Sequence, residues 1–201
     1  MKTIILGTAH LESTPGKRSP DGKFREYKYS RKICKTLKSL LTEMGYQVFI
    51  DVEQDDLKLT QSQELKYRCD VVNSFVKQYK DCIYVSIHVN AAGNGSQWMK
   101  ATGWSAYTSV GKTKADRLAE CLYDSAKIVL KDKKLRTDNT DGDSDMEAHL
   151  YVLKHTNCPA VLTENFFQDN KEDVEFLESD EGFHKIIKVH LEGILKYLKD
   201  N

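Results

Sequence analysis

The sequence predicts a single α/β domain built on a mixed, mostly parallel sheet of about six strands with helices on both faces. The chain of 201 residues is of single-domain size, and no Pro/Ser/Gly-rich linker or internal repeat divides it. Short apolar segments also alternate along the chain with longer segments of helical periodicity, which is the pattern of parallel strands joined by covering helices. We therefore treat residues 1–201 as one domain.

Six short apolar segments are predicted as strands, and the first, residues 3–7, holds the run Ile4-Ile5-Leu6. The other five are residues 47–51, 83–88, 103–108, 150–153 and 160–164. Four segments with apolar residues three and four positions apart are predicted as amphipathic helices: 29–44, 61–78, 112–130 and 182–198. Ile33, Leu37 and Leu41 belong to the apolar stripe of the first helix, and Gly45 suits its C-terminal stop before the second strand.

The charge balance argues against a nucleic acid or an anionic membrane as the main partner. Lys and Arg total 30, as do Asp and Glu, so the formal net charge is zero. No segment approaches the roughly 20 apolar residues of a membrane-spanning helix. The apolar run after Met1 is too short for a signal peptide. We expect synthesis in the cytoplasm without a signal peptide and without membrane insertion, so any extracellular substrate would be met after release or export.

The five cysteines are scattered and form no CxxC pair. They are Cys34, Cys69, Cys82, Cys121 and Cys158, and each lies in or beside an apolar segment. This pattern indicates reduced, mostly buried thiols rather than a cysteine-ligated metal or a thiol nucleophile.

Two histidines and two glutamates are the candidate functional residues. His10 and His88 each follow an apolar strand, and such positions lie at the edge of a sheet where α/β proteins build their sites. A single histidine of this kind is commonly structural, but two imidazoles and one carboxylate form a catalytic zinc set with an open position. No short ligand spacing such as HExxH supports the assignment, so the residues alone leave it open.

The choice of carboxylate is also open from residue type alone. Glu26 lies at the start of the first helix, where an acidic residue is ordinary, and Glu12 is a less obvious alternative. Glu164 ends the apolar run Ala160-Val161-Leu162, so its carboxylate must be paired, near a metal or raised in pKa. Each outcome suits a general acid or base, and the competing interpretation is a helix cap or a salt-bridged structural residue.

The acidic loop, His149 and two serines give weaker indications of function. The acidic loop at residues 138–147 fails the EF-hand template: counted from Asp141, Met146 stands where Gly is needed and Val152 where Glu is needed. We interpret it as a solvated loop and a candidate wall of the cleft, and His149 directly after it could reach the site. Ser86 and Ser105 lie in no GxSxG elbow, and no nucleotide-binding loop is present.

Taken together, these segments resemble the zinc-dependent N-acetylmuramoyl-L-alanine amidases of the amidase-3 type. The resemblance extends from Thr3 to about Tyr197. It is carried by Gly7-Thr8-Ala9-His10, by Glu26 before the first helix, by the helix at residues 65–73, by Ser86-Ile87-His88-Val89-Asn90-Ala91, by residues 151–153, by Pro159 through Phe166 and by residues 170–177. The Ser-x-His-x-Asn-Ala box is the most specific of these matches.

The resemblance implies that His10, Glu26 and His88 bind Zn²⁺ and that Glu164 is catalytic. The implied reaction is hydrolysis of the amide between N-acetylmuramic acid and the L-alanine of peptidoglycan or muropeptides, on a fold of the phosphorylase/hydrolase-like kind. We expect the protein to be a monomer. The first turn departs from the family's Asp-Pro-Gly-His-Gly pattern and Thr163-Glu164-Asn165 from its usual Val-Glu-Thr/Gly, which bears on the shape of the substrate cleft. A phage-type endolysin is our hypothesis for the setting. The alternatives are an inactive peptidoglycan-binding module on the same fold and a zinc peptidase or amidohydrolase with another small amide substrate.

Overall fold

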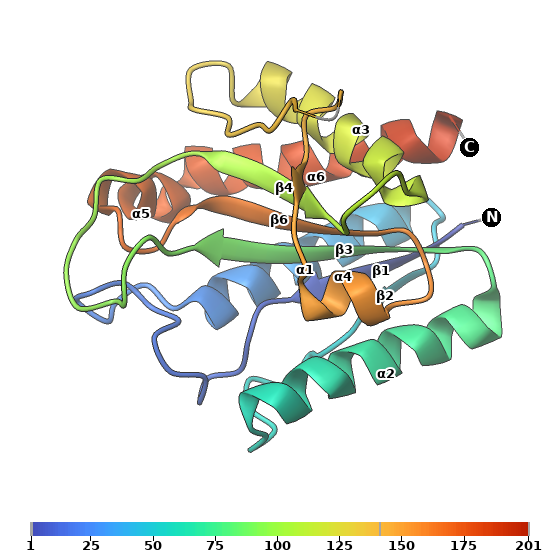
Figure 1. Ribbon diagram of the computed structural model, residues 1–201, viewed down its shortest axis with the longest axis horizontal. Helices are drawn as coiled ribbons and strands as arrows, with labels where there is room; N and C mark the ends of the chain where they lie inside the picture. Colours follow the sequence, from blue (N-terminus) through green and yellow to red (C-terminus); the bar gives the residue numbers. More distant parts are fainter. Residues whose placement is uncertain (1, 141, 201) are drawn as a thin grey trace.

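A computed structural model describes residues 2–140 and 142–200 of the chain. Its elements in chain order are β1 (Thr3–Thr8), α1 (Glu26–Glu43), β2 (Val48–Ile50), α2 (Gln61–Tyr79), β3 (Cys82–Asn90), β4 (Trp104–Thr108), α3 (Lys114–Val129), β5 (Met146–Glu147), α4 (Tyr151–His155), β6 (Ala160–Phe167), α5 (Lys171–Glu178) and α6 (Asp180–Asp200). The predicted α/β class is confirmed (Figure 1).

The six strands form one sheet in the order β2-β1-β3-β6-β4-β5. The pairs β1–β2, β1–β3, β3–β6 and β4–β5 are parallel, and only β4–β6 is antiparallel among the strands described. The sheet is therefore mixed and mostly parallel, as predicted. Because β1, β3 and β6 are parallel neighbours, their carboxyl ends meet at one edge of the sheet.

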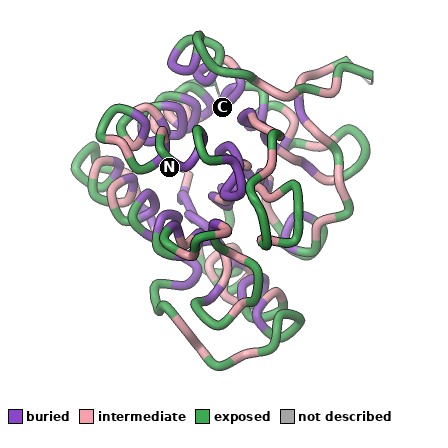
Figure 2. Tube along the Cα trace, turned by 90° about the vertical axis from the view of Figure 1, so that its left-hand side faces the viewer, coloured by how far each residue is buried: buried purple, intermediate pink, exposed green. Residues whose placement is uncertain are grey.

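Two apolar layers cover the two faces of the sheet. Side chains alternate along each strand, so Ile4 and Val85 pack on the layer of α1, α3 and α6, whereas Ile5 and Tyr84 pack on the layer of α2 and α4. Figure 1 shows α2 on one side of the sheet and α3 and α6 on the other. Viewed from the edge at which β3 ends, the buried central strands are enclosed by more exposed loops (Figure 2).

The prediction of a strand at residues 150–153 is wrong. This segment begins α4, in which the backbone N–H of Lys154 donates to the carbonyl of Leu150 and Thr156 Oγ1 donates to the carbonyl of Val152. Four apolar residues are too few for periodicity to separate a helix turn from a strand, and packing against α2 decides the outcome. The sixth strand is instead β5, a two-residue segment, and α5 was not predicted.

The cysteine prediction is confirmed, because all five are free thiols and Cys158 is the only one that is not fully buried. No helix among the described residues is long and apolar enough to cross a membrane.

Candidate metal centre

His10, Glu26 and His88 lie together at the carboxyl edge of the sheet. One potential ligand atom from each lies within 4.8 Å of the other two. His10 Nε2 is 3.8 Å from Glu26 Oε2, and His88 Nδ1 is 3.2 Å from Glu26 Oε1. The two imidazole rings are nearly perpendicular, with centroids 5.1 Å apart. The structure therefore brings together the three residues singled out in the sequence.

Three different elements supply these side chains. His10 follows β1 by two residues, Glu26 is the first residue of α1, and His88 lies near the end of β3. Glu26 is only 1% exposed, and its Oε1 accepts a hydrogen bond from the backbone N–H of Val89 at 3.1 Å. Glu26 is thus not the solvated acidic residue that a helix N-terminus ordinarily carries. Glu12, the other carboxylate considered, is exposed and accepts a hydrogen bond from Tyr27 instead.

The pKa shifts of His10 and Glu26 suit metal binding. Burial lowers the pKa of His10 to about 3, although the charge of Glu26 opposes this shift. Burial acts to raise the pKa of Glu26, but His10 and His88 outweigh it and bring the pKa to about 2. An ionised carboxylate beside a neutral imidazole has lone pairs available for a cation.

One oxygen of the cluster lacks a partner. Glu26 Oε2 is buried and accepts no hydrogen bond within the described structure, although a buried carboxylate oxygen is costly when unsatisfied. A cation bound between Glu26 and the two imidazoles would satisfy it. Two histidines and one glutamate are also the donor set of catalytic zinc sites that keep a fourth position open. The residues present therefore fit a zinc ion.

Neighbouring polar groups orient His88. Its Nε2 lies 3.1 Å from Ser86 Oγ, a hydrogen bond that leaves Nδ1 facing Glu26. Ser86 precedes His88 by two residues on the same strand, so both side chains point to the same face of the sheet. Asn165 Nδ2 donates to the backbone carbonyl of His88 at 2.9 Å. Ser86 is thus a partner of the imidazole and forms no Ser-His-Asp arrangement.

Glu164 lies beside the cluster because β6 pairs with β3 in a register that sets it opposite His88. Burial and the charge of Glu26 raise the pKa of Glu164 well above its usual value. The side chain as a whole is partly exposed, whereas its Oε2 is buried and without a hydrogen-bond partner. A carboxyl group in this setting can take up and release a proton at the sheet edge.

Sequence reasoning missed Lys17, which lies in the loop between β1 and α1. Its backbone carbonyl accepts the N–H of Glu26 at 3.2 Å, and its positive charge contributes to lowering the pKa of His10, Glu26 and Glu164. The Pro/Gly content of residues 11–24 indicated a functional loop. Nothing in the sequence indicated which of its side chains would approach the cluster.

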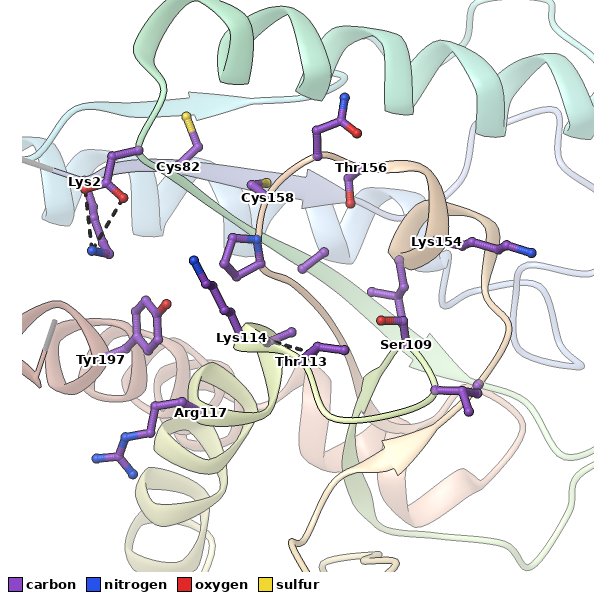
Figure 3. A pocket seen from close by; sticks show the side chains of 18 of the residues that line it. Lys2, Cys82, Ser109, Thr113, Lys114, Arg117, Lys154, Thr156, Cys158 and Tyr197 are labelled. Atoms are coloured by element: carbon purple, nitrogen blue, oxygen red, sulfur yellow. Dashed lines mark hydrogen bonds and ion pairs between the residues drawn. The ribbon is translucent and has the colours of Figure 1, made fainter. Parts of the chain in front are cut away.

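His149 does not join this cluster. It lines an open cavity of about 1000 Å³ together with Lys2, Cys82 and Pro159, which lie at the amino ends of β1, β3 and β6 (Figure 3). This cavity is therefore at the opposite edge of the sheet from His10 and His88. Asp145 of the acidic loop is buried and accepts a hydrogen bond from Thr108, whereas Asp141 lies outside the described residues.

Sequence comparisons identify known proteins that are similar to this chain. The chain is 30% identical over 169 residues to the endolysin of Bacillus phage SPP1, a match covering 83% of this chain and 56% of the endolysin. It is 28% identical to the probable cell wall amidase LytH of Staphylococcus saprophyticus, over 99% of this chain and 59% of LytH. The chain thus spans about half the length of these curated relatives.

Solved structures show the same fold. The CwlD amidase of Clostridioides difficile, solved in complex with the GerS lipoprotein, aligns over all of both chains with a TM-score of 0.80 and 25% identity. An N-acetylmuramoyl-L-alanine amidase from Clostridium difficile 630 aligns with a TM-score of 0.83 and 22% identity, over all of this chain and 98% of the other. The Amidase_3 family, described as N-acetylmuramoyl-L-alanine amidase, matches residues 4–196. The chain therefore belongs to the amidase-3 family of N-acetylmuramoyl-L-alanine amidases.

Proposed function

We propose that this domain is a zinc-dependent N-acetylmuramoyl-L-alanine amidase. It hydrolyses the amide between N-acetylmuramic acid and the L-alanine of peptidoglycan or muropeptides. The observation that carries the proposal is the buried His10–Glu26–His88 cluster, with one orphaned carboxylate oxygen, beside a glutamate of raised pKa in a chain of this family. His10, Glu26 and His88 are the proposed ligands, and Glu164 is the proposed catalytic residue.

The chemistry divides between the cation and the protein. A zinc ion at such a site lowers the pKa of a water molecule and polarises a carbonyl group. Glu164 takes the proton of the attacking water on its carboxylate, holds it, and delivers it to the leaving alanine nitrogen. Ser86 and Asn165 keep His88 in place through the ring nitrogen and the backbone carbonyl. Lys17 supplies positive charge at the mouth of the site, which favours the ionised form of Glu164 before proton uptake.

The proposed setting is the bacterial cell wall, which the enzyme reaches after release or export, as a phage-type endolysin does. The similarity to the SPP1 endolysin supports this setting. The similarity to LytH, named a probable cell wall amidase, supports the same substrate.

The test measures zinc content and dye release from purified sacculi for the wild type and for His88→Ala. We expect about one zinc per chain, wall cleavage and new N-terminal alanine in the wild type, and loss of all three in His88→Ala. His184→Ala is the matched control, because His184 is exposed and bonds only to the carbonyl of Asp180. It should retain zinc and activity.

The other outcomes point to the two alternative functions. Zinc binding without wall cleavage, but with cleavage of free peptide amides, would replace the proposal by a zinc peptidase or amidohydrolase. Binding to sacculi with neither zinc nor cleavage would replace it by an inactive binding module.

A further inference from the structure

Two buried arginines from different helices converge on the backbone carbonyl of His10. Arg31 of α1 donates to it from Nη1 at 3.0 Å, and Arg68 of α2 donates from Nη2 at 3.1 Å. Both arginines are only 3% exposed. Two guanidinium groups on one carbonyl oxygen place two buried positive charges at this residue. Burying them has a high desolvation cost, so their contacts with His10 need a structural explanation.

The backbone of His10 is in an unfavourable conformation. Its φ is +39°, a left-handed value that is uncommon for a residue with a side chain. Such conformations persist only where surrounding contacts impose them, and they cluster at functional sites. The chain reaches His10 through Ala9, whose carbonyl also accepts a hydrogen bond from Arg31 at 3.1 Å. The arginines therefore fix the carbonyl groups of Ala9 and His10, and these contacts hold His10 in its left-handed conformation.

Arg68 is itself held by fixed partners. Its Nε donates to Glu64 Oε1 at 3.0 Å, and its Nη1 donates to Asp51 Oδ2 at 2.9 Å and to Thr8 Oγ1 at 3.1 Å. Asp51 in turn accepts the backbone N–H of Thr8 at 2.9 Å. Four of the five N–H groups of the planar guanidinium are thus engaged, and the contacts of Nε and Nη1 aim Nη2 at the carbonyl of His10.

We infer that Arg68, supported by Arg31, is a positioning residue for the imidazole of His10. The arginines hold the left-handed backbone of His10, and this backbone directs the ring toward Glu26 and His88. Neither arginine belongs to the His10–Glu26–His88 cluster, and both act through His10. This inference rests on the proposed role of His10 as a zinc ligand.

The test is the zinc affinity of Arg68→Lys and Arg31→Lys, measured by competition with a chromophoric chelator, together with the thermal midpoint of each metal-free protein. Lysine keeps the charge but cannot bridge several acceptors with a rigid fork. We expect zinc to bind about 10- to 100-fold more weakly in Arg68→Lys, as is typical when a group that orients a metal ligand is removed. The visible spectrum of the cobalt-substituted protein should also change, because it reports the ligand geometry.

The control is Leu122→Ala, which opens a space between α3 and α6 far from the sheet edge. It should lower the thermal midpoint while leaving zinc affinity and the cobalt spectrum unchanged. Arg31→Lys provides a second variant of the same carbonyl contact if Arg68→Lys does not fold.

The inference is overturned if the arginine variants bind zinc like the wild type, or if Leu122→Ala weakens zinc binding to the same extent. Failure of the proposed function looks different. If the proposed zinc site is wrong, the wild type itself binds no zinc and His88→Ala changes nothing. If only the proposed substrate is wrong, the wild type binds zinc but does not cleave the wall, and the zinc affinities of the arginine variants still decide the inference.

Discussion

Glu26 is buried and Glu164 is partly buried at the same sheet edge, and their surroundings push the pKa values of the two carboxyl groups in opposite directions. The imidazoles of His10 and His88 keep Glu26 ionised. Burial and the negative charge of Glu26 favour the protonated form of Glu164. A pair of carboxyl groups separated in this way supplies one permanent anion and one group that exchanges protons. This division agrees with the proposed roles of Glu26 as a ligand and Glu164 as the proton-transfer residue.

Replacing Glu164 by glutamine should therefore separate binding from turnover. Glu164→Gln retains the size and hydrogen-bonding capacity of the side chain but cannot accept the proton. We expect zinc content to stay at the wild-type level while the rate of wall cleavage falls by about 10²- to 10⁴-fold. Metal analysis and dye release on the same preparation provide the measurement. Cleavage at the wild-type rate would remove Glu164 from the mechanism.

His190 predicts how the folded state responds to acid. It is fully buried on α6, and its Nδ1 is bonded to the carbonyl of Ile186 while its Nε2 is bonded to Thr163 Oγ1. Burial lowers the pKa of His190 to about 4, although the Ile186 contact opposes this. In the unfolded chain His190 therefore takes up a proton near pH 6.5, whereas in the folded chain it does so only near pH 4. The contribution of His190 to the free energy of unfolding is therefore fully present above pH 6.5 and is lost as the pH falls toward 4.

The measurement is urea unfolding at several pH values for the wild type and His190→Gln. The wild type should lose on the order of 3 kcal/mol more than the variant between pH 7 and pH 4. His184→Gln, at an exposed histidine on the same helix, should keep the wild-type slope. Equal slopes for His190→Gln and the wild type would contradict the prediction.

At the level of elements, the sequence was most informative where periodic segments are long. The predicted helices at 61–78 and 112–130 correspond to α2 and α3, and both begin at threonine capping boxes, those of Thr60 and Thr113. The first helix begins three residues earlier than predicted, because Glu26-Tyr27-Lys28 holds a single aromatic residue between two charged ones and so shows no apolar periodicity. That segment contains Glu26, so its role depended on a boundary that periodicity does not define.

The other residues of the site also differ in how far the sequence alone could predict them. His10, His88 and Glu164 could be singled out because each comes shortly after an apolar run of the sequence. The burial of Glu26 and the approach of Lys17 depend on the path of the 11–24 loop over the sheet edge, and local sequence does not encode that path. Arg31 and Arg68 lie on helices where arginine is ordinary, so only the folded structure reveals their common acceptor.

The contact between α3 and α6 gives a prediction in which two effects have opposite signs. A Cβ added at Gly193 would lie 2.8 Å from the Cα of Leu122. Alanine favours a helix over glycine by up to about 1 kcal/mol, but overpacking against a backbone atom costs about 1–3 kcal/mol. We expect Gly193→Ala to be destabilising overall. Urea unfolding tests this, with the exposed helix substitution Ser39→Ala as a control that should change stability little, and a stabilised Gly193→Ala would show that the two helices separate easily.

Across the whole molecule, we expect metal binding and folding to be coupled, because the three proposed ligands come from the loop after β1, from α1 and from β3. An ion that binds only the folded chain should stabilise it by about 2.7 kcal/mol at a free concentration 100 times its Kd. For a domain of this size each kcal/mol corresponds to roughly 2–4 °C in Tm. Differential scanning calorimetry with increasing zinc should show this rise in the wild type. His88→Ala should show none, and an equal rise in that variant would place zinc elsewhere.

The register of the central strands has a consequence for how such an enzyme can vary. His88 and Glu164 are opposite each other on hydrogen-bonded strands, so the interstrand spacing of about 4.8 Å fixes the backbone distance between the proposed ligand and the proposed proton acceptor. A slip of one residue would turn every side chain of a strand to the other face, so this distance cannot be adjusted in small steps. Loops such as 11–24 and 91–101 are free of that constraint. Under the proposed function, changes in these loops can therefore reshape the substrate cleft for a different cell wall while the distance between His88 and Glu164 stays the same.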